Sequence, residues 1–340
     1  MKSIRTFARG DTLGEFSRFA RALDLDPAAL LAQVGMDARL VDNPGLVPAH
    51  AVVELFEITS ITSGMDDFGL RLGEARAMPD HSSILSMLQA EATVRDALIA
   101  FLQLHSDAIC LHLDESDHPI VAVNVITGYP QQSRQTIDVA VAMITRILRQ
   151  LLGETWLPAS VAFTHARPAS RARYERFFRA PVHFSQEFNG IVLNRGDLDK
   201  PPVALPRRQA GKEGPSCGDN PVSSEAAVHQ VMRLVAMALP RGEAKADRIA
   251  RYIGTHRQGI NRRLAGVELN FSEVVNLVRR ELAVQYMLES DRPLLEVAGM
   301  VGFDSLRAFS RWFGQSFGSS PSSWRATNNK PATKTRQLST

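Results

Sequence analysis

The chain has 340 residues, of which 44% are apolar and 22% charged, so its length and composition allow about two folded domains. It contains no run of about 20 apolar residues that could cross a bilayer, and no charged start followed by a long apolar run, so we expect a cytoplasmic protein without a membrane partner. Cys110 and Cys217 are the only cysteines, which argues against a disulfide framework.

Residues 1–205 have the pattern of a mixed α and β domain. Apolar spacing predicts helices at 12–34, 48–64, 93–105 and 135–152, with Thr93 as an N-cap, and a further helix at 171–178. Two apolar runs, 109–113 and 119–125, flank the polar segment 114–118 and predict a β-hairpin. Further strands are expected at 156–163, 182–184 and 190–193.

The first strand of this hairpin carries a group of potential metal ligands. Cys110, His112 and Asp114 would share one face of the strand, with His105 and Asp107 just before it. The spacing matches no zinc signature, and the chain has no Gly-x-Ser-x-Gly motif and no phosphate-binding glycine loop. We therefore expect no metal site, no cofactor and no enzymatic activity, and we keep a metal-responsive protein as the less favoured alternative.

The aromatic residues of this domain suggest a pocket for a small molecule. Trp156 and Phe163 are candidate lining residues, and Gln103 and His105 could present polar groups to a ligand from a helix end. Ordinary core packing is the favoured explanation of the aromatic residues.

Residues 206–221 are polar, rich in Gly and Pro and without apolar periodicity, which predicts a flexible linker. The last residues, 328–340, resemble a disordered tail. We expect a second domain between them, at residues 222–327.

Positive charge is concentrated in the last 100 residues. They hold 16 Lys and Arg against nine Asp and Glu, a net charge of +7, which leaves −4 for the first 240 residues because the whole chain carries +3. Arginine outnumbers lysine there by 13 to three, and arginine suits both phosphate and guanine contacts. This asymmetry indicates a nucleic-acid footprint confined to one domain.

Two helix-turn-helix patterns occur in this basic region. In the first, Ala250 lets two helices approach, Gly254 makes the turn and Ile260 packs the second helix against the first. Ala298, Gly302 and Ala308 repeat this spacing in the second pattern. One amphipathic helix over residues 271–288 should connect the two units, with Ser272 as its N-cap.

These residues resemble the DNA-binding domain of the AraC/XylS family of bacterial transcription regulators. The similarity is carried by the segments Arg262–Leu264, Arg279–Ala283, Val301–Phe313 and Ser320–Arg325. Gly259 departs from the family, which usually has a side chain there, so the first motif could be softer by about 0.5–1 kcal/mol. Residues 68–74, 92–98 and 152–158 also resemble the N-terminal effector-binding domain of one subgroup, whose mixed α and β content differs from a cupin barrel.

The resemblance implies which residues face DNA. The first recognition helix should present Arg257, Gln258, Asn261 and Arg262, while Ile260 and Leu264 face the core. The second should present Leu306, Arg307, Ser310 and Arg311, while Ala308, Phe309 and Phe313 turn inward. Arg262 and Arg311 are the preferred base readers, because arginine bound to guanine is the commonest specific contact. A phosphate contact or a solvated surface position is the alternative for each residue, and we expect Arg279 and Arg280 on the helix surface or beside phosphates rather than at bases.

The sequence thus predicts a transcription regulator that binds specific sites on double-stranded promoter DNA. By resemblance we expect a homodimeric activator that responds to a small-molecule effector, contacts RNA polymerase and associates with the nucleoid when bound to DNA. An architectural DNA-binding protein that needs no effector is the main alternative, and it would bind with a steep salt dependence and little sequence preference.

Overall fold

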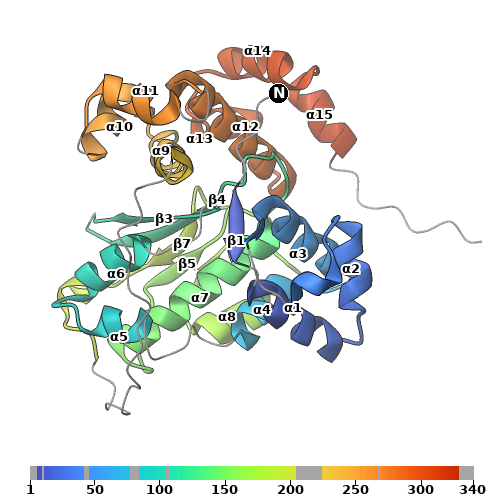
Figure 1. Ribbon diagram of the computed structural model, residues 1–340, viewed down its shortest axis with the longest axis vertical. Coiled ribbons are helices and arrows are strands. Elements are labelled where there is room, and N and C mark those ends of the chain that lie inside the picture. The colour runs from blue at the N-terminus through green and yellow to red at the C-terminus, as the bar shows by residue number, and fades with distance from the viewer. Residues whose placement is uncertain are drawn as a thin grey trace, which may run out of the picture.

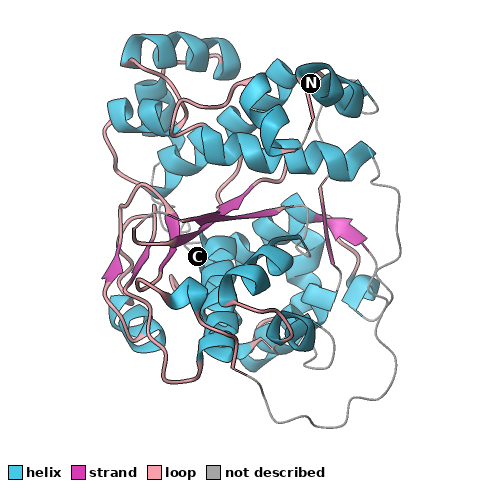
Figure 2. Ribbon diagram, turned by 90° about the vertical axis from the view of Figure 1, so that its left-hand side faces the viewer, coloured by secondary structure: helices cyan, strands magenta, loops and turns pink. Residues whose placement is uncertain are grey.

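A computed structural model describes residues 6–9, 11–41, 46–76, 84–103, 108–115, 117–203, 224–253, 255–265 and 269–328. The expected linker and all but the first residue of the expected tail lie outside these ranges. A five-stranded sheet lies between two helical layers, with the N-terminal helices on one face and the C-terminal helices on the other (Figures 1 and 2). In the described part of the chain, no helix is both long and apolar enough to cross a membrane.

The N-terminal domain begins with a small helical subdomain. A short ribbon of β1 (Phe7–Arg9) and β2 (Leu46–Pro48) accompanies four helices and a 3₁₀ turn: α1 (Asp11–Ala22), α2 (Pro27–Gln33), η1 (Ala38–Val41), α3 (Ala49–Ser63) and α4 (Phe68–Ala75). The single helix expected at 12–34 is wrong, because the chain breaks before Pro27 and Asp26 caps the second helix through the Ala28 amide at 2.9 Å.

The sheet has the strand order β3-β4-β7-β5-β6. Its strands are β3 (Ile109–Asp114), β4 (Ile120–Val125), β5 (Ser160–Ala162), β6 (Val182–His183) and β7 (Asn189–Val192), and only the β5–β6 pair is parallel. The predicted hairpin is confirmed as β3 and β4, whereas the strand expected at 156–163 is limited to three residues.

The remaining elements of this domain cover one face of the sheet and its edges. They are α5 (Ile84–Gln89), α6 (Val94–Gln103), α7 (Arg134–Leu152), α8 (Arg171–Phe178) and η2 (Asp197–Asp199). Thr93 accepts a hydrogen bond from the Asp96 amide at 3.2 Å, which confirms the predicted N-cap of α6. The α7 helix is buried along most of its length and packs against both α4 and the sheet.

The C-terminal domain is entirely helical within the described residues. It consists of α9 (Ser224–Ala238), α10 (Ala246–Tyr252), α11 (Arg257–Ala265), α12 (Phe271–Glu289), α13 (Leu294–Met300), α14 (Leu306–Phe317) and α15 (Pro321–Asn328). Its apolar core extends into the sheet, because Cys110 of β3 and Ile126 after β4 pack in the same cluster as the residues of α9 and α12. The two-domain α+β and all-α architecture predicted from the sequence is confirmed.

Candidate DNA-binding surface

The first helix-turn-helix unit is formed by α10 and α11. Ile260 and Leu264 are fully buried in the core, as the sequence predicts, while the side chains of α11 that were expected to face DNA are exposed: Arg257, Gln258, Asn261 and Arg262. Helical spacing of three and four residues explains this separation of faces. The unit therefore presents two arginines and two amides on one solvent-facing side.

Gly259 lies on the inner side of this unit. A Cβ at this position would sit 2.1 Å from the Thr255 hydroxyl oxygen, a distance that real Cβ atoms do not show. The Gly259 amide donates to the His256 carbonyl at 2.7 Å. The departure from the family's pattern therefore accompanies a close approach of Thr255 to the recognition helix, and any side chain here would require Thr255 to move.

The second unit is formed by α13 and α14. Ser305 caps α14 by accepting from the Ala308 amide at 3.3 Å, and Gly302 makes the turn with φ +77°. A Cβ on Gly302 would also lie 2.8 Å from the Leu239 carbonyl oxygen, so glycine is required for both reasons.

The exposed side of α14 differs from the prediction at one position. Leu306, Arg307 and Arg311 are exposed and Ser310 is half-buried, but Ala308 is exposed rather than turned inward. The turn between α13 and α14 is one residue longer than that between α10 and α11, so Phe309 is the buried residue corresponding to Ile260.

Four arginines lie on these surfaces: Arg257, Arg262, Arg307 and Arg311. None of them forms an ion pair with any residue that the structure describes. Their charge is therefore left for an external anion, and a row of unpaired guanidinium groups on two recognition helices favours the phosphates and guanine edges of DNA. The α11 and α14 helices lie in the layer opposite the N-terminal helices (Figure 1).

The α12 helix joins the two units and is confirmed as one continuous helix. Its N-cap is Asn270, not Ser272, since the Asn270 side chain accepts from the Glu273 amide at 3.0 Å and Glu273 accepts from the Asn270 amide at 2.7 Å. This reciprocal pair is a capping box. A carboxamide three residues before a glutamate was the available signal in the sequence.

Two arginines of α12 support the second unit from within. Arg279 donates to the Val301 carbonyl at 2.9 Å and stacks on Phe303, with 4.5 Å between the guanidinium carbon and the ring centre. Arg280 lies 4.9 Å above the ring centre of Phe317, at the end of α14. Both side chains are half-buried, so the expected phosphate contacts compete with packing roles.

The opposite face of α12 contacts the N-terminal domain through three polar residues, Glu281, Gln285 and Glu289, all of them buried. They stand four residues apart and thus share one face of the helix. Sequence reasoning missed them because it treats polar residues on an amphipathic helix as exposed. The signal was present in the apolar neighbours on both sides, which indicate a helix buried all round.

The Glu281 carboxylate accepts hydrogen bonds from the Thr127 amide, the Thr127 hydroxyl at 2.8 Å and the Gly128 amide at 3.0 Å. Gln285 donates to the Val125 carbonyl at 2.7 Å. These bonds attach α12 to the loop between β4 and α7. Burial raises the pKa of the Glu281 carboxyl to about 8, although the hydrogen bonds oppose the rise.

Glu289 makes the next contact along the same face. One of its oxygens accepts from the Ser133 amide at 2.6 Å, directly before α7, and its backbone carbonyl accepts from the Ala166 amide at 2.7 Å. Burial raises the pKa of the Glu289 carboxyl to about 7, against the opposing charges of His165 and Arg134. Farther out, Arg292 donates to the Ser185 carbonyl.

The face of β3 that carries possible metal ligands also meets the C-terminal domain. Asp114 forms an ion pair with Arg241, and Cys110 packs in the core of the C-terminal domain. His112 is largely buried, and this burial together with Arg241 lowers the pKa of its imidazole. Cys110, His112 and Asp114 thus belong to the contact between the domains, whereas His105 and Asp107 lie outside the described residues.

A buried polar triad connects the elements of the N-terminal domain that α12 contacts. Asp138 of α7 accepts from the Tyr174 hydroxyl at 2.6 Å and lies 3.1 Å from Nε2 of His165. All three side chains are almost fully buried. They bind α7, α8 and the loop after β5 into one unit, and this loop contains the Ala166 amide that meets α12.

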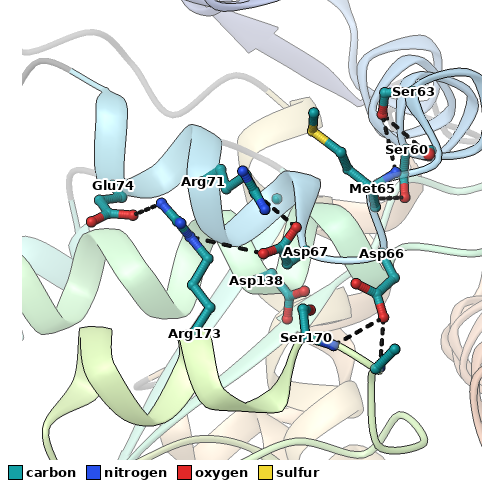
Figure 3. A network of polar contacts seen from close by, with 12 residues as sticks. Ser60, Ser63, Met65, Asp66, Asp67, Arg71, Glu74, Asp138, Ser170 and Arg173 are labelled. Carbon is teal, nitrogen blue, oxygen red and sulfur yellow. Dashed lines mark hydrogen bonds and ion pairs between the residues drawn. The ribbon is translucent and has the colours of Figure 1, made fainter. Parts of the chain in front are cut away.

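A second network lies nearby and fixes the loop before α4 (Figure 3). Arg71 and Arg173 approach the same carboxylate, that of Asp67, with N···O distances of 2.8 and 3.8 Å, and Arg173 also pairs with Glu74 at 2.6 Å. Asp66 accepts from the Ala169 amide at 2.6 Å. These contacts join α4 to α8 on the side of α7 away from the C-terminal domain.

Of the four candidate effector residues, only the side chains of Trp156 and Phe163 are described, and both are buried. Phe163 is fully buried between Tyr174, Phe178 and Phe184, and Trp156 donates through Nε1 to Asp197 at 2.8 Å. His105 lies outside the described residues, as does the side chain of Gln103. The two described aromatic residues thus have the environment of ordinary core packing.

The fold and the two recognition helices define a DNA-binding protein of the helix-turn-helix class with an additional N-terminal domain. Residues 25–202 match the family described as "Arabinose-binding domain of AraC transcription regulator, N-term", and residues 249–327 match a helix-turn-helix domain family. The chain belongs to the AraC family of transcription regulators.

Relatives of this chain are also transcription regulators. It is 24% identical to the HTH-type transcriptional regulator VirS of Mycobacterium tuberculosis over 338 residues, which cover 95% of this chain and 97% of VirS. It is 26% identical to the ornithine utilization regulator of Pseudomonas aeruginosa over 178 residues, 52% of each chain. The crystal structure of the transcriptional regulator CdpR from Pseudomonas aeruginosa is 20% identical and covers 90% of this chain and 97% of that one, with a TM-score of 0.37.

Proposed function

We propose that this regulator activates transcription as a homodimer when a small molecule binds its N-terminal domain. The family membership supports DNA binding and an effector-binding role for that domain. Activation, contact with RNA polymerase and pairing of protomers are carried over from the resemblance to the AraC/XylS family. Because the target is chromosomal DNA, we expect the active protein at the nucleoid.

The observation that carries the DNA-binding proposal is the pair of exposed, arginine-bearing recognition helices. Arg262 of α11 and Arg311 of α14 are the proposed base readers, because both are exposed and neither has an acidic partner among the described residues. The remaining candidates on the two helices supply adenine, thymine-methyl and phosphate contacts, and all of them are exposed except the half-buried Ser310: Arg257, Gln258, Asn261, Leu306, Arg307 and Ser310.

Selection of genomic fragments by the full-length protein, followed by sequencing, tests sequence-specific binding. A regulator should retain a few promoters with two motif halves about one helical turn apart, at ~10³-fold or greater preference over random DNA. Diffuse retention with a steep salt dependence would instead favour the architectural alternative.

Substitution of the readers tests the residue assignment. Arg262→Ala and Arg311→Ala should each weaken binding to the selected site by about 1–3 kcal/mol and relax base preference locally, measured by fluorescence anisotropy on a panel of base-substituted sites. Arg195→Ala, on the exposed surface of the N-terminal domain, is the matched control. Equal binding of parent and variants to target and random DNA would show that other residues read the bases.

Activation and dimerisation need separate measurements. A promoter reporter in cells with and without the gene decides between activation and repression, and sedimentation of the purified protein gives its oligomeric state. The effector role of Gln103, His105, Trp156 and Phe163 stays a prediction, to be tested by ligand screening of single variants.

A further inference from the structure

The turn that joins α13 to α14 is packed between two other elements of the C-terminal domain. On one side, the carbonyl oxygen of Leu239, directly after α9, would lie 2.8 Å from a Cβ on Gly302. On the other side, Nη2 of Arg279 would lie 3.6 Å from the same Cβ. The turn is therefore enclosed on both sides, and Arg279 of α12 forms one of them.

Arg279 makes two directional contacts with this turn. Its Nε donates to the Val301 carbonyl at 2.9 Å. Because Val301 is the C-cap of α13, this bond satisfies one of the carbonyl groups that a helix leaves unpaired at its end. The guanidinium carbon also lies 4.5 Å from the ring centre of Phe303, two residues later. The hydrogen bond and the stacked ring thus fix both ends of a three-residue turn.

The Phe303 ring connects this contact to the recognition helix. Its centre lies 5.2 Å from that of the Trp312 ring and 5.8 Å from that of the Phe309 ring, both on α14. Phe309 is fully buried, and its position determines which side of α14 faces solvent, including the exposed Arg311. Arg279 therefore acts, through one aromatic ring, on the rotation of α14 about its axis.

The contacts of Arg279 depend on the shape of the guanidinium group. Arg279 is half-buried and forms no ion pair with any residue that the structure describes. Burial lowers the pKa of its guanidinium group. A carbonyl oxygen and an aromatic face hold the group in place. Lysine would keep the charge, but it has no donor at the position of Nε and no flat group to stack on a ring.

The two helix-turn-helix units differ in how their turns are fixed. Within the described part of the chain, the hydrogen bond and the ring contact of Arg279 both go to the second unit. In the first unit, the Thr255 amide donates to the Ala250 carbonyl at 2.9 Å, and Thr255 lies against Gly259. A change at Arg279 should therefore affect one recognition helix and leave the other as it is.

We propose that Arg279 is a positioning residue for base reading, which holds the turn between α13 and α14 so that α14 presents its side chains to the bases without Arg279 contacting a base itself. The proposal rests on the proposed function, because it concerns base reading by α14. Groups that read bases have to be held within about 0.5 Å and about 10–20° of their productive geometry. A loosened α14 should lose base discrimination first, while phosphate contacts keep the protein on DNA.

Base preference in the two half-sites tests this role. Binding of the full-length protein to the selected site and to each of its single-base substitutions gives the preference at every position, and the Arg262→Ala and Arg311→Ala variants assign each half-site to its helix. Arg279→Met, which keeps an unbranched apolar side chain, should lower the preference in the α14 half-site about five- to tenfold. The preference in the other half-site should change by less than about twofold, which also shows that the variant is folded. Arg195→Met, at an exposed position of the N-terminal domain, should behave as the parent.

Arg279→Lys separates positioning from a phosphate contact. If Arg279 positions the turn, lysine should fail as methionine does, and the dependence of affinity on salt should stay that of the parent. A phosphate contact predicts that lysine restores binding, while methionine weakens binding to all sequences and lowers the slope of log affinity against log salt by about 0.9. This second pattern would overturn the proposal.

Phe303→Leu tests the same contact from the side of the turn. It should reproduce the loss of preference in the α14 half-site. Adding Arg279→Met to it should lower that preference by no more than about a further twofold, because both changes break one contact. Additive losses would mean that Arg279 acts by another route, and the proposal would be wrong.

The parent protein separates this proposal from the function on which it rests. If the parent prefers its site and Arg279→Met keeps that preference at every position, the turn holds its shape without Arg279 and only the positioning role fails. If the parent shows no base preference in either half-site, the proposed function fails and the positioning role fails with it.

Discussion

Two adjacent residues of α14 differ sharply in environment, and this difference sets the alignment of the second recognition helix. Ala308 is exposed, whereas Phe309 is fully buried against Phe303 and Phe313. The sequence placed Ala308 on the inner face together with Phe309 and Phe313, because Ala308 repeats the spacing of the first unit. The longer second turn shifts the register by one residue, and turn length is not encoded in the small-residue pattern that located the motif.

Phe309→Ala should therefore destabilise the C-terminal domain by about 3–5 kcal/mol, since it removes a buried aromatic side chain and leaves a cavity. Ala308→Ser should change stability by less than about 0.5 kcal/mol. Urea denaturation of the full-length variants, followed by tryptophan fluorescence, measures both. Comparable losses in the two variants would mean that Ala308 is packed in solution and that the register described for α14 is incorrect.

At the scale of elements, α12 was predicted as one continuous helix, but only part of its role was accessible from sequence. Its apolar periodicity specifies a helix and a core face. The side-chain partners of Glu281, Gln285 and Glu289 lie more than 150 residues earlier in the chain, at the end of β4 and in the loop that follows it, which has no motif of its own. Pairing across such distances depends on the packing of whole domains, which local patterns do not contain.

The start of α12 offers a test that compares two candidate N-cap residues, Asn270 and Ser272. Asn270→Ala should cost about 0.5–2 kcal/mol of stability, because it removes the side-chain acceptor of the capping box. Ser272→Ala should be nearly neutral, because Ser272 is exposed and lies inside the helix. Thermal unfolding monitored by circular dichroism distinguishes them. A larger loss of stability in Ser272→Ala than in Asn270→Ala would mean that Ser272 is the N-cap, as the sequence predicts.

At the scale of the whole molecule, the two domains share a buried polar contact whose charge depends on pH. Glu281 and Glu289 enter it from α12, and the half-buried Glu57 lies nearby on α3, where its carboxylate accepts from the Gln135 amide at 2.7 Å. Burial raises the pKa of Glu57 to about 8, and the nearby charge of Glu289 adds to the rise. Arg134 and His165 are the cationic or titratable groups that face Glu289 and oppose the rise in its pKa.

The direction of the pH dependence follows from these pKa values. If the domains separate, water reaches Glu281 and Glu289, and their pKa values return toward the ordinary value of 4.5. The docked arrangement then binds more protons than the separated one between pH 4.5 and pH 8. By linkage, docking is strongest below pH 4.5 and weakens as the pH rises to about 8, above which the loss is complete.

Small-angle X-ray scattering of the full-length protein over this pH range should therefore show a radius of gyration that grows as the pH rises. Replacing both carboxyl groups, in Glu281→Gln with Glu289→Gln, should flatten most of this dependence, because neither amide titrates, while Glu57 leaves a residual slope. Glu187→Gln, at an exposed position, should behave as the parent. An unchanged pH profile in the double variant would assign the titration to other groups and leave the α12 contact insensitive to protons.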